Sequence, residues 1–209
     1  MADDCGCGPD ENLVSKSAGY RRALWIVVGL NIGYGVIELI GGFLSNSQAL
    51  KADALDFLGD GSITFLAIMA LGWSLIWRAR SAFLQGLFLG GLGLWVLMST
   101  VLRLAGDSSV EASLMGAFAF AALIVNLLAV VPLMPYREGD ANMRAVWLFS
   151  RNDAIGNVAV IIAAVVVWAT KSSWPDLIVA IAIAGLFLHS AWGIIRDARR
   201  DLNTVKGEI

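Results

Sequence analysis

Histidine and cysteine are almost absent from this chain, which has one histidine and two cysteines among 209 residues. Because His189 stands alone, the sequence offers neither a serine–histidine arrangement nor the His-Glu-x-x-His motif of zinc hydrolases. Cys5 and Cys7 are too close in sequence for an ordinary structural disulfide. We therefore expect no enzymatic activity and no prosthetic group.

Charge is also scarce, since Asp, Glu, Lys and Arg together make up only 15% of the chain. The net charge of -2 and the pI near 5.3 leave no basic stripe for phosphates, so we expect no nucleic-acid partner. By contrast, 58% of the residues are hydrophobic and the mean hydropathy is +0.73. This composition is typical of a protein that crosses the lipid bilayer several times.

Long apolar runs predict an all-α membrane protein with six transmembrane helices, because about 20 apolar residues are needed for each crossing. The predicted spans are residues 23–44, 48–77, 82–104, 110–134, 142–170 and 174–195. Turn-like stretches separate them at residues 45–47, 78–81, 105–109, 135–141 and 171–173. We expect three parts: an acidic, cysteine-containing and disordered cytoplasmic tail at 1–20, a membrane domain at 21–196 and a short cytoplasmic tail at 197–209, with no soluble domain.

The distribution of Lys and Arg predicts the orientation, because cytoplasmic loops carry an excess of positive charge. With six spans, only Arg103 and Lys171 fall on one side of the membrane. Lys51 and Arg151 fall inside spans, where they are either counter-ions of acidic groups or snorkel towards an interface. Both termini are therefore predicted to be cytoplasmic, on the side that carries Lys16, Arg21, Arg22, Arg78, Arg80, Arg137, Arg144, Arg196, Arg199, Arg200 and Lys206.

Four polar residues lie inside two of the predicted spans, where an ionised side chain costs roughly 2.5 to 3.5 kcal/mol to insert. Asp56 and Asp60 are one helical turn apart in the second span, and Asp153 and Asn157 have the same spacing in the fifth. Counting about 1.5 Å per residue from the span ends places Asp56 and Asp153 near the bilayer midplane. The alternative is that these groups only hold helices together through hydrogen bonds.

Carboxylates gathered in a low-dielectric interior repel one another unless a proton or a metal ion lies between them. A metal ion binds only the deprotonated groups, so its arrival expels protons and its departure lets protons return. The four residues therefore predict a site that exchanges a divalent cation for protons.

The motif Ser47-Gln-Ala-Leu-Lys-Ala-Asp-Ala-Leu-Asp-Phe-Leu-Gly-Asp60 resembles the second span of the cation diffusion facilitators, the family that contains zinc transporters. Asn31, Glu38-Leu-Ile-Gly-Gly, Asp153-Ala-Ile-Gly-Asn-Val-Ala-Val and Trp-Pro-Asp176 extend the resemblance over residues 20–200. The resemblance implies a homodimer in a bacterial-type inner membrane. It also implies that this homodimer exports divalent metals, Zn²⁺ above all, from the cytoplasm in exchange for protons. It also implies that Asp56, Asp60 and Asp153 bind the metal.

Phe149 departs from the family pattern, because it stands where a fourth ligand is expected and has no metal-binding atom. Asn157, Asn152 or water could replace that ligand. A site made only of oxygen atoms also suits Mn²⁺, Co²⁺ or Fe²⁺. We therefore keep two alternatives to a zinc exporter: an exporter of one of these harder ions, and a membrane subunit that binds metal without transporting it.

Three further features have competing interpretations. Cys5 and Cys7 either collect metal or belong to a tail of minor function. The small residues Gly86, Gly90, Gly91 and Gly93 form either the homodimer interface or a contact with a neighbouring span of the same subunit. Asp176 is predicted to lie at the start of the last helix. Glu38 and Asn31 are interpreted as interior polar packing, and Asp53, which resembles a family position, as a structural group near the outer mouth rather than a ligand.

Overall fold

The computed structural model describes residues 18–70, 73–104, 109–136 and 141–207, with the backbone alone for residues 75, 136, 141–152 and 204–207. All regular structure within these ranges is helical, which confirms the predicted all-α class. The helices are α2 (Ala18–Leu44), α3 (Gln48–Met69), α4 (Leu75–Leu104), α5 (Ala112–Val130), α6 (Ala141–Thr170) and α7 (Trp174–Gly207), with the 3₁₀ helix η2 (Val131–Tyr136) after α5. The cysteine tail lies outside the described residues.

Five of the six α-helices are long and apolar enough to cross a membrane. The exception, α3, carries Lys51, Asp53, Asp56 and Asp60 within 22 residues. Its length of about 33 Å at 1.5 Å per residue nevertheless matches a hydrocarbon core of about 30 Å. The helix that is not apolar enough to be recognised as a membrane span is therefore the one that carries Asp56 and Asp60, two of the predicted metal ligands.

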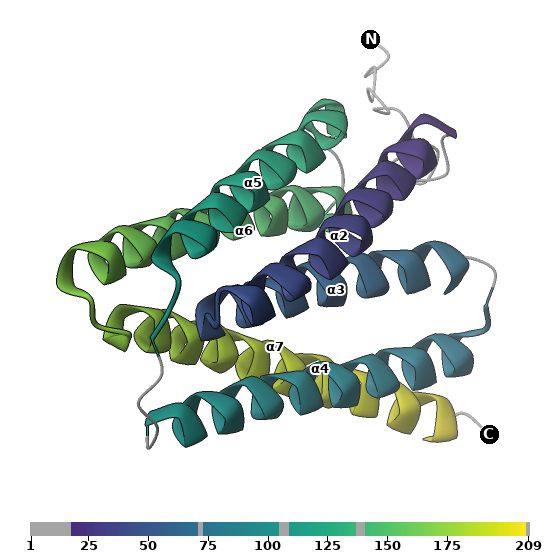
Figure 1. Ribbon diagram of the computed structural model, residues 1–209. Helices are drawn as coiled ribbons and strands as arrows, with labels where there is room; N and C mark the ends of the chain where they lie inside the picture. Colours follow the sequence, from purple (N-terminus) through teal and green to yellow (C-terminus); the bar gives the residue numbers. More distant parts are fainter. Residues whose placement is uncertain (1–17, 71–72, 105–108, 137–140, 208–209) are drawn as a thin grey trace, which may run out of the picture.

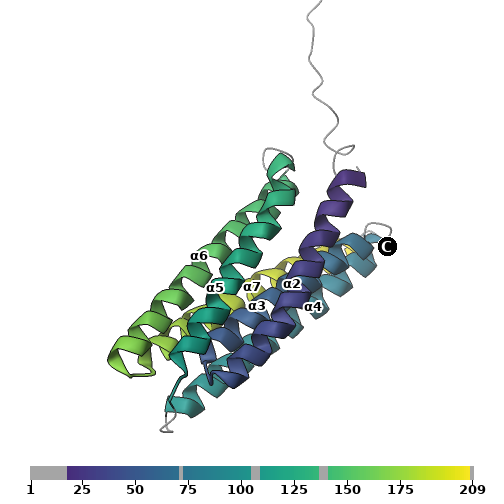
Figure 2. The same ribbon diagram turned by 45° about the horizontal axis from the view of Figure 1, so that its top comes forward.

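The helices pack as three antiparallel pairs, α2 with α3, α4 with α7, and α5 with α6. In the view of Figure 1, α2 and α3 lie between the other two pairs, whereas in the rotated view of Figure 2 α7 appears between α5 and α2. Helices α6 and α7 also contact each other directly. Contacts of α3 with α7 and of α2 with α5 join the pairs. This arrangement surrounds the polar helix α3 with apolar neighbours.

Small residues allow the close approach of α4 and α7. A Cβ atom on Gly86 would lie 2.6 Å from Cγ1 of Ile195, and one on Gly93 would lie 3.1 Å from Cβ of Phe187. Between lipid-exposed helices there is little hydrophobic driving force, so such close van der Waals packing favours association. Gly86 and Gly93 therefore make a contact within one subunit, whereas nothing lies within 4 Å of a Cβ on Gly91.

The predicted turn at residues 78–81 is wrong. Helix α3 ends at Met69 and α4 already begins at Leu75, so Arg78 and Arg80 lie in the first turns of α4. The backbone N–H of Arg78 donates to the carbonyl oxygen of Ser74 at 3.0 Å. Arginine near a helix end does not mark a turn, because its long side chain can carry the charge outward to the headgroups. The helix that contains the last predicted span continues beyond residue 195, to Gly207.

Candidate metal-binding site in the membrane domain

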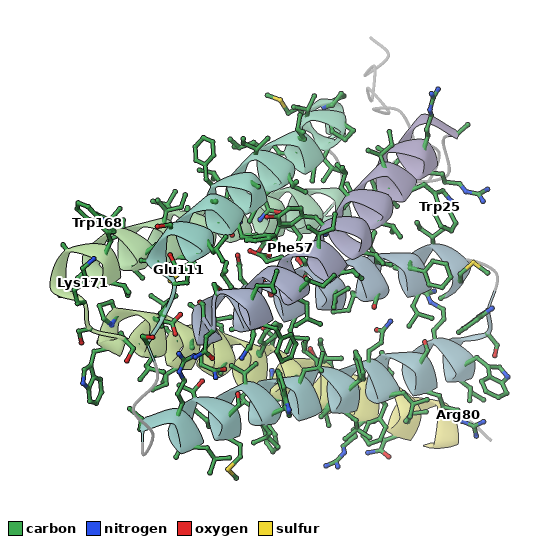
Figure 3. The ribbon with its side chains drawn as sticks, in the orientation of Figure 1. Trp25, Phe57, Arg80, Glu111, Trp168 and Lys171 are labelled. Carbon is green, nitrogen blue, oxygen red and sulfur yellow. The ribbon has the colours of Figure 1, made fainter. Side chains whose placement is uncertain are left out.

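Helices α2 and α3 pack against each other along most of their length, and their alignment determines which polar side chains of the two helices lie close together. The rings of Tyr34 and Phe57 lie 5.2 Å apart, near the middle of the helix pair (Figure 3). A Cβ atom on Gly35 would lie 3.0 Å from Cβ of Phe57, and one on Gly61 would lie 3.3 Å from Cβ of Asn31. Positions further along α2 therefore face positions earlier in α3.

Further towards the end of α2, the same register brings Glu38 against Asp53. A Cβ atom on Gly42 would lie 3.0 Å from the backbone nitrogen of Lys51, so Glu38 faces the turn of α3 between Lys51 and Phe57. Glu38 is fully buried and Asp53 is 4% exposed. Their carboxyl groups lie close enough to interact with each other.

No N–H or O–H group reaches either oxygen of Glu38 or Oδ2 of Asp53 within the described part of the chain. Two carboxyl groups contain no hydrogen-bond donor when both are ionised, so their pairing requires a bound proton. From the sequence, Glu38 was expected to be interior polar packing and Asp53 a structural group near the outer mouth, so this pair was not predicted. The sequence did contain one signal: Asn31 and Glu38 are seven residues apart, and so are Asp53 and Asp60.

The predicted acidic residues of α3 and α6 lie together. The carboxyl groups of Asp60 and Asp153 lie close enough to interact with each other. Asp56 lies close enough for its charge to act on both. All three side chains are partly buried. The arrangement concentrates negative charge between two helices that are distant in sequence.

Asn157 lies one turn after Asp153 on α6 and is fully buried. Neither its Oδ1 nor its Nδ2 atom has a hydrogen-bond partner among the side chains and backbone that the structure describes. Because a buried amide without partners is costly, this side chain is available for a ligand. The side chains of Asn152 and Phe149 lie outside the described residues, so the alternative fourth ligand Asn152 stays a prediction.

Asn31 is a further polar residue beside the acidic group. It is 6% exposed, its Oδ1 has no partner among the described residues, and its Cβ faces Gly61, the neighbour of Asp60. Within the described ranges, however, no three His, Cys, Asp or Glu side chains are already placed to chelate a metal ion. A cation would therefore have to replace the proton between Asp60 and Asp153 and draw a further ligand inward.

The sequence profile of the cation efflux transmembrane domain matches residues 24–203. The chain belongs to the cation diffusion facilitator family. It is 31% identical to the zinc transporter ZitB of Escherichia coli over 195 residues, which cover 87% of this chain and 62% of ZitB.

Two further members of the family extend the comparison. The metal cation efflux system protein CzcD of Cupriavidus metallidurans is 26% identical over 86% of this chain and 61% of its own length. A Bacillus subtilis protein named as a cadmium, cobalt and zinc/H(+)-K(+) antiporter is 27% identical over 85% of this chain and 62% of its own length. The chain thus spans about three-fifths of these relatives.

In this cation diffusion facilitator, Asp176 closes one end of the helix bundle. Its carboxylate accepts hydrogen bonds from Ser47 Oγ at 2.5 Å, from the Gln48 backbone nitrogen at 2.9 Å and from that of Ala49 at 3.0 Å. Asp176 is in the first turn of α7, as predicted, but it caps the N-terminus of α3. A carboxylate is favourable there because the first N–H groups of a helix are unpaired and carry partial positive charge.

The basic residues near this end do not neutralise the acidic site. Arg103 donates to the carbonyl oxygen of Asn46. The Nζ atom of Lys51 lies 4.7 Å from the centre of the Phe43 ring. Of the two interpretations of Lys51, the structure favours placement towards the helix end over pairing with Asp56 or Asp60. The side chain of Arg151 lies outside the described residues.

Proposed function

We propose that this membrane domain exports a divalent cation, and that Asp56, Asp60 and Asp153 bind it. The observation that carries the proposal is the pairing of Asp60 on α3 with Asp153 on α6, with Asp56 beside them. Three carboxyl groups in this position cannot all be ionised without a cation to offset their repulsion. The Oδ1 atom of Asn157 supplies the fourth ligand, with Asn152 or water as the alternatives.

Exchange for protons follows from the ligand chemistry. The proton between Asp60 and Asp153 must leave before a metal ion can bind both groups, and it can return when the ion leaves. The name of the Bacillus subtilis relative includes proton exchange, which supports this coupling. Protons are thus the counter-substrate of the proposed exporter.

Zn²⁺ is the proposed substrate because several relatives carry zinc in their names. The ligand set itself is less selective, because carboxylate and amide oxygens also suit Mn²⁺, Co²⁺ and Fe²⁺. An exporter of one of these ions is therefore the second candidate.

The proposed topology has six spans in a bacterial-type inner membrane, and α3 is one of them. Both termini lie on the cytoplasmic side. The distribution of Lys and Arg supports this orientation. The end closed by Asp176, Ser47 and Arg103 then faces outward. Transport requires the three helix pairs to rearrange around the midplane site so that this end opens. We further propose a homodimer, following the resemblance to the family.

Transport is tested with purified protein in liposomes that contain a metal-sensitive dye. We expect saturable Zn²⁺ flux driven by a proton gradient, lost in Asp153→Asn and retained in Asp197→Asn. Asp197 is the matched control because its carboxylate is 65% exposed on α7, away from the site. Zn²⁺ binding without flux in the wild type would instead favour a subunit that only binds metal. Equal flux in wild type and Asp153→Asn would contradict the proposed site.

A further inference from the structure

Glu38 on α2 and Asp53 on α3 form a second acidic pair, which the proposed metal site does not use. Glu38 is fully buried and Asp53 is 4% exposed. Within the described part of the chain, no donor reaches either oxygen of Glu38 or Oδ2 of Asp53. Since two ionised carboxyl groups repel each other in a low-dielectric interior, the pair has to hold a proton or another cation.

The side chains around the pair supply neither a positive charge nor a hydrogen bond to it. The Tyr34 hydroxyl, one turn before Glu38 on α2, donates to the carbonyl oxygen of Phe118 at 2.6 Å. The Nζ atom of Lys51 lies 4.7 Å from the centre of the Phe43 ring. Helices α5 and η2, which also pack on α2, contain no Asp, Glu, Lys, Arg or His. The bound cation is therefore not a side chain of these elements.

A proton fits this pair better than a metal ion. Divalent metal ions in proteins take four or more ligands. Among the described residues, no three His, Cys, Asp or Glu side chains are placed together to chelate one. A proton needs only one oxygen atom that carries it and one that accepts it, and the two carboxyl groups supply both.

The pair lies between the proposed metal site and the capped end of the bundle. Asp53 is three residues, or about 4.5 Å, nearer than Asp56 to the N-terminus of α3, which Asp176 caps. The charge of Asp56 acts on Glu38, and that of Asp53 acts on Asp153 of α6. Carboxyl groups thus continue from the metal site towards the end that faces outward in the proposed topology.

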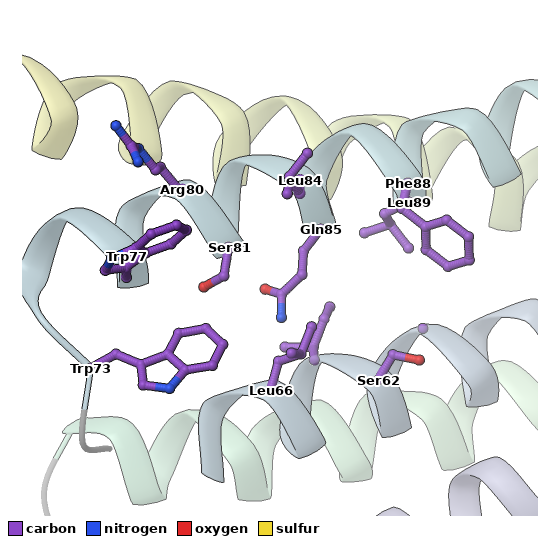
Figure 4. A pocket seen from close by; sticks show the side chains of 12 residues that line it. Ser62, Leu66, Trp73, Trp77, Arg80, Ser81, Leu84, Gln85, Phe88 and Leu89 are labelled. Atoms are coloured by element: carbon purple, nitrogen blue, oxygen red, sulfur yellow. The ribbon is translucent and has the colours of Figure 1, made fainter. Parts of the chain in front are cut away.

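A cavity in the other half of the bundle does not reach the pair. Figure 4 shows this cavity between α3 and α4, and its lining on α3 begins at Gly59 and ends at Leu66. Neither Glu38 nor Asp53 borders it. Arg103 of α4 is also directed elsewhere, because it donates to a backbone carbonyl at the capped end. The neighbours of the pair along α3 are therefore the capped end and the metal ligands.

We propose that Glu38 and Asp53 bind a proton that passes to the metal ligands once the metal ion has left outward. The O–H bond of the pair breaks, an O–H bond forms on Asp56, and a proton from outside restores the pair. Protonated ligands let the metal-free site return to the cytoplasmic side without unpaired carboxylates. This inference rests on the proposed proton exchange and adds to it a proton carrier that does not bind metal.

Glu38→Gln separates the proton carrier from the metal site. An amide has the shape and the charge of a protonated carboxyl group, so we expect Zn²⁺ binding to be unchanged. Exchange of labelled Zn²⁺ between two sides with equal Zn²⁺ should also be unchanged, because the site never returns empty. Net Zn²⁺ flux driven by a proton gradient should fall about tenfold or more, because a positioned side chain speeds proton transfer by about 10²-fold or more.

Tyr34→Phe is the matched control, because it removes a hydroxyl beside the pair but leaves both carboxyl groups. Any loosening of α2 against α5 in this variant should lower exchange and net flux to the same degree. Asp53→Asn should show the same split between the two fluxes as Glu38→Gln, and it replaces that variant if Glu38→Gln does not fold. Equal loss of both fluxes, or retention of both, in the carboxyl variants would overturn the proposal.

Infrared spectroscopy of the Zn²⁺-bound protein tests the bound proton without a transport assay. We expect the wild type to show a protonated carboxyl group that is missing from Glu38→Gln, because the metal ligands are then deprotonated. A Zn²⁺-bound wild type without a protonated carboxyl group would overturn the proposed carrier and leave cation export untouched. A wild type without proton-driven flux would instead overturn the proposed exchange itself, and the proton carrier with it.

Discussion

The carboxyl group of Asp60 on α3 lies close enough to that of Asp153 on α6 for the two to interact, although α4, α5 and η2 separate the two residues in the chain. This pair joins two different helix pairs of the bundle, α2 with α3 and α5 with α6. The affinity for a cation that bound both groups would therefore depend on the relative position of the two helix pairs, and binding would in turn change that position. The same contact connects ion binding to helix movement.

Replacing Asp60 or Asp153 with Asn should weaken Zn²⁺ binding by roughly 10- to 100-fold. The loss of one charged ligand contact corresponds to about 1.5 to 3 kcal/mol, and each 1.4 kcal/mol is about tenfold in Kd. Isothermal titration calorimetry on the purified protein measures the change. Asp197→Asn should bind Zn²⁺ as the wild type does, and equal weakening in this control would show a nonspecific effect.

Zn²⁺ affinity should rise with pH, because metal binding displaces protons from the carboxyl groups. For each proton released, the affinity rises by about tenfold per pH unit while the site is protonated. The affinity is therefore lowest in acid and levels off once the site has lost its protons. Calorimetry in buffers of different ionisation enthalpy counts the protons released. Asp153→Asn should release fewer protons than the wild type, and an unchanged count would remove Asp153 from the site.

Gly35→Ala should destabilise the protein by about 1 to 3 kcal/mol through overpacking, because its Cβ would lie 3.0 Å from Cβ of Phe57 and 3.1 Å from the carbonyl oxygen of Ala54. It should also weaken Zn²⁺ binding, since the register of α2 and α3 shifts. Gly33→Ala is the matched control on the same helix, because nothing lies within 4 Å of its Cβ position. Thermal unfolding in detergent compares the two. Equal melting temperatures would mean that this close contact does not set the register.

Asp176→Ala should lower stability by about 2 kcal/mol, because the N-terminus of α3 loses a buried cap that accepts three hydrogen bonds. If the capped end is the outer gate, the variant should also expose Ser47→Cys to labelling from outside the liposome more readily. Labelling of Ser47→Cys alone provides the reference. Destabilisation without increased labelling would restrict Asp176 to a structural role.

The positions of the helices and the convergence of α3 with α6 could be predicted from the sequence. Apolar length identifies helices locally, and the one-turn spacing of Asp56 with Asp60 places both on one face. Three features depended on contacts between distant segments and were missed: the break between α3 and α4, the capping of α3 by Asp176, and the pairing of Glu38 with Asp53. Each requires knowledge of which helices pack together and in what register, and a single sequence does not contain it directly.

The two interpretations of Gly86 illustrate the same limit. A surface of small residues shows that some helix approaches closely, but the sequence does not specify whether that helix belongs to the same subunit. The contact with Ile195 of α7 decides for the same subunit.

The most direct test of the account is anomalous scattering from crystals of the full chain soaked in Zn²⁺ and, separately, in Mn²⁺. We expect one peak between α3 and α6, coordinated by Asp56, Asp60 and Asp153, with the Asn157 amide oxygen directed at the ion. A peak elsewhere in the membrane domain, with Asp60 and Asp153 still paired to each other, would contradict the proposed site.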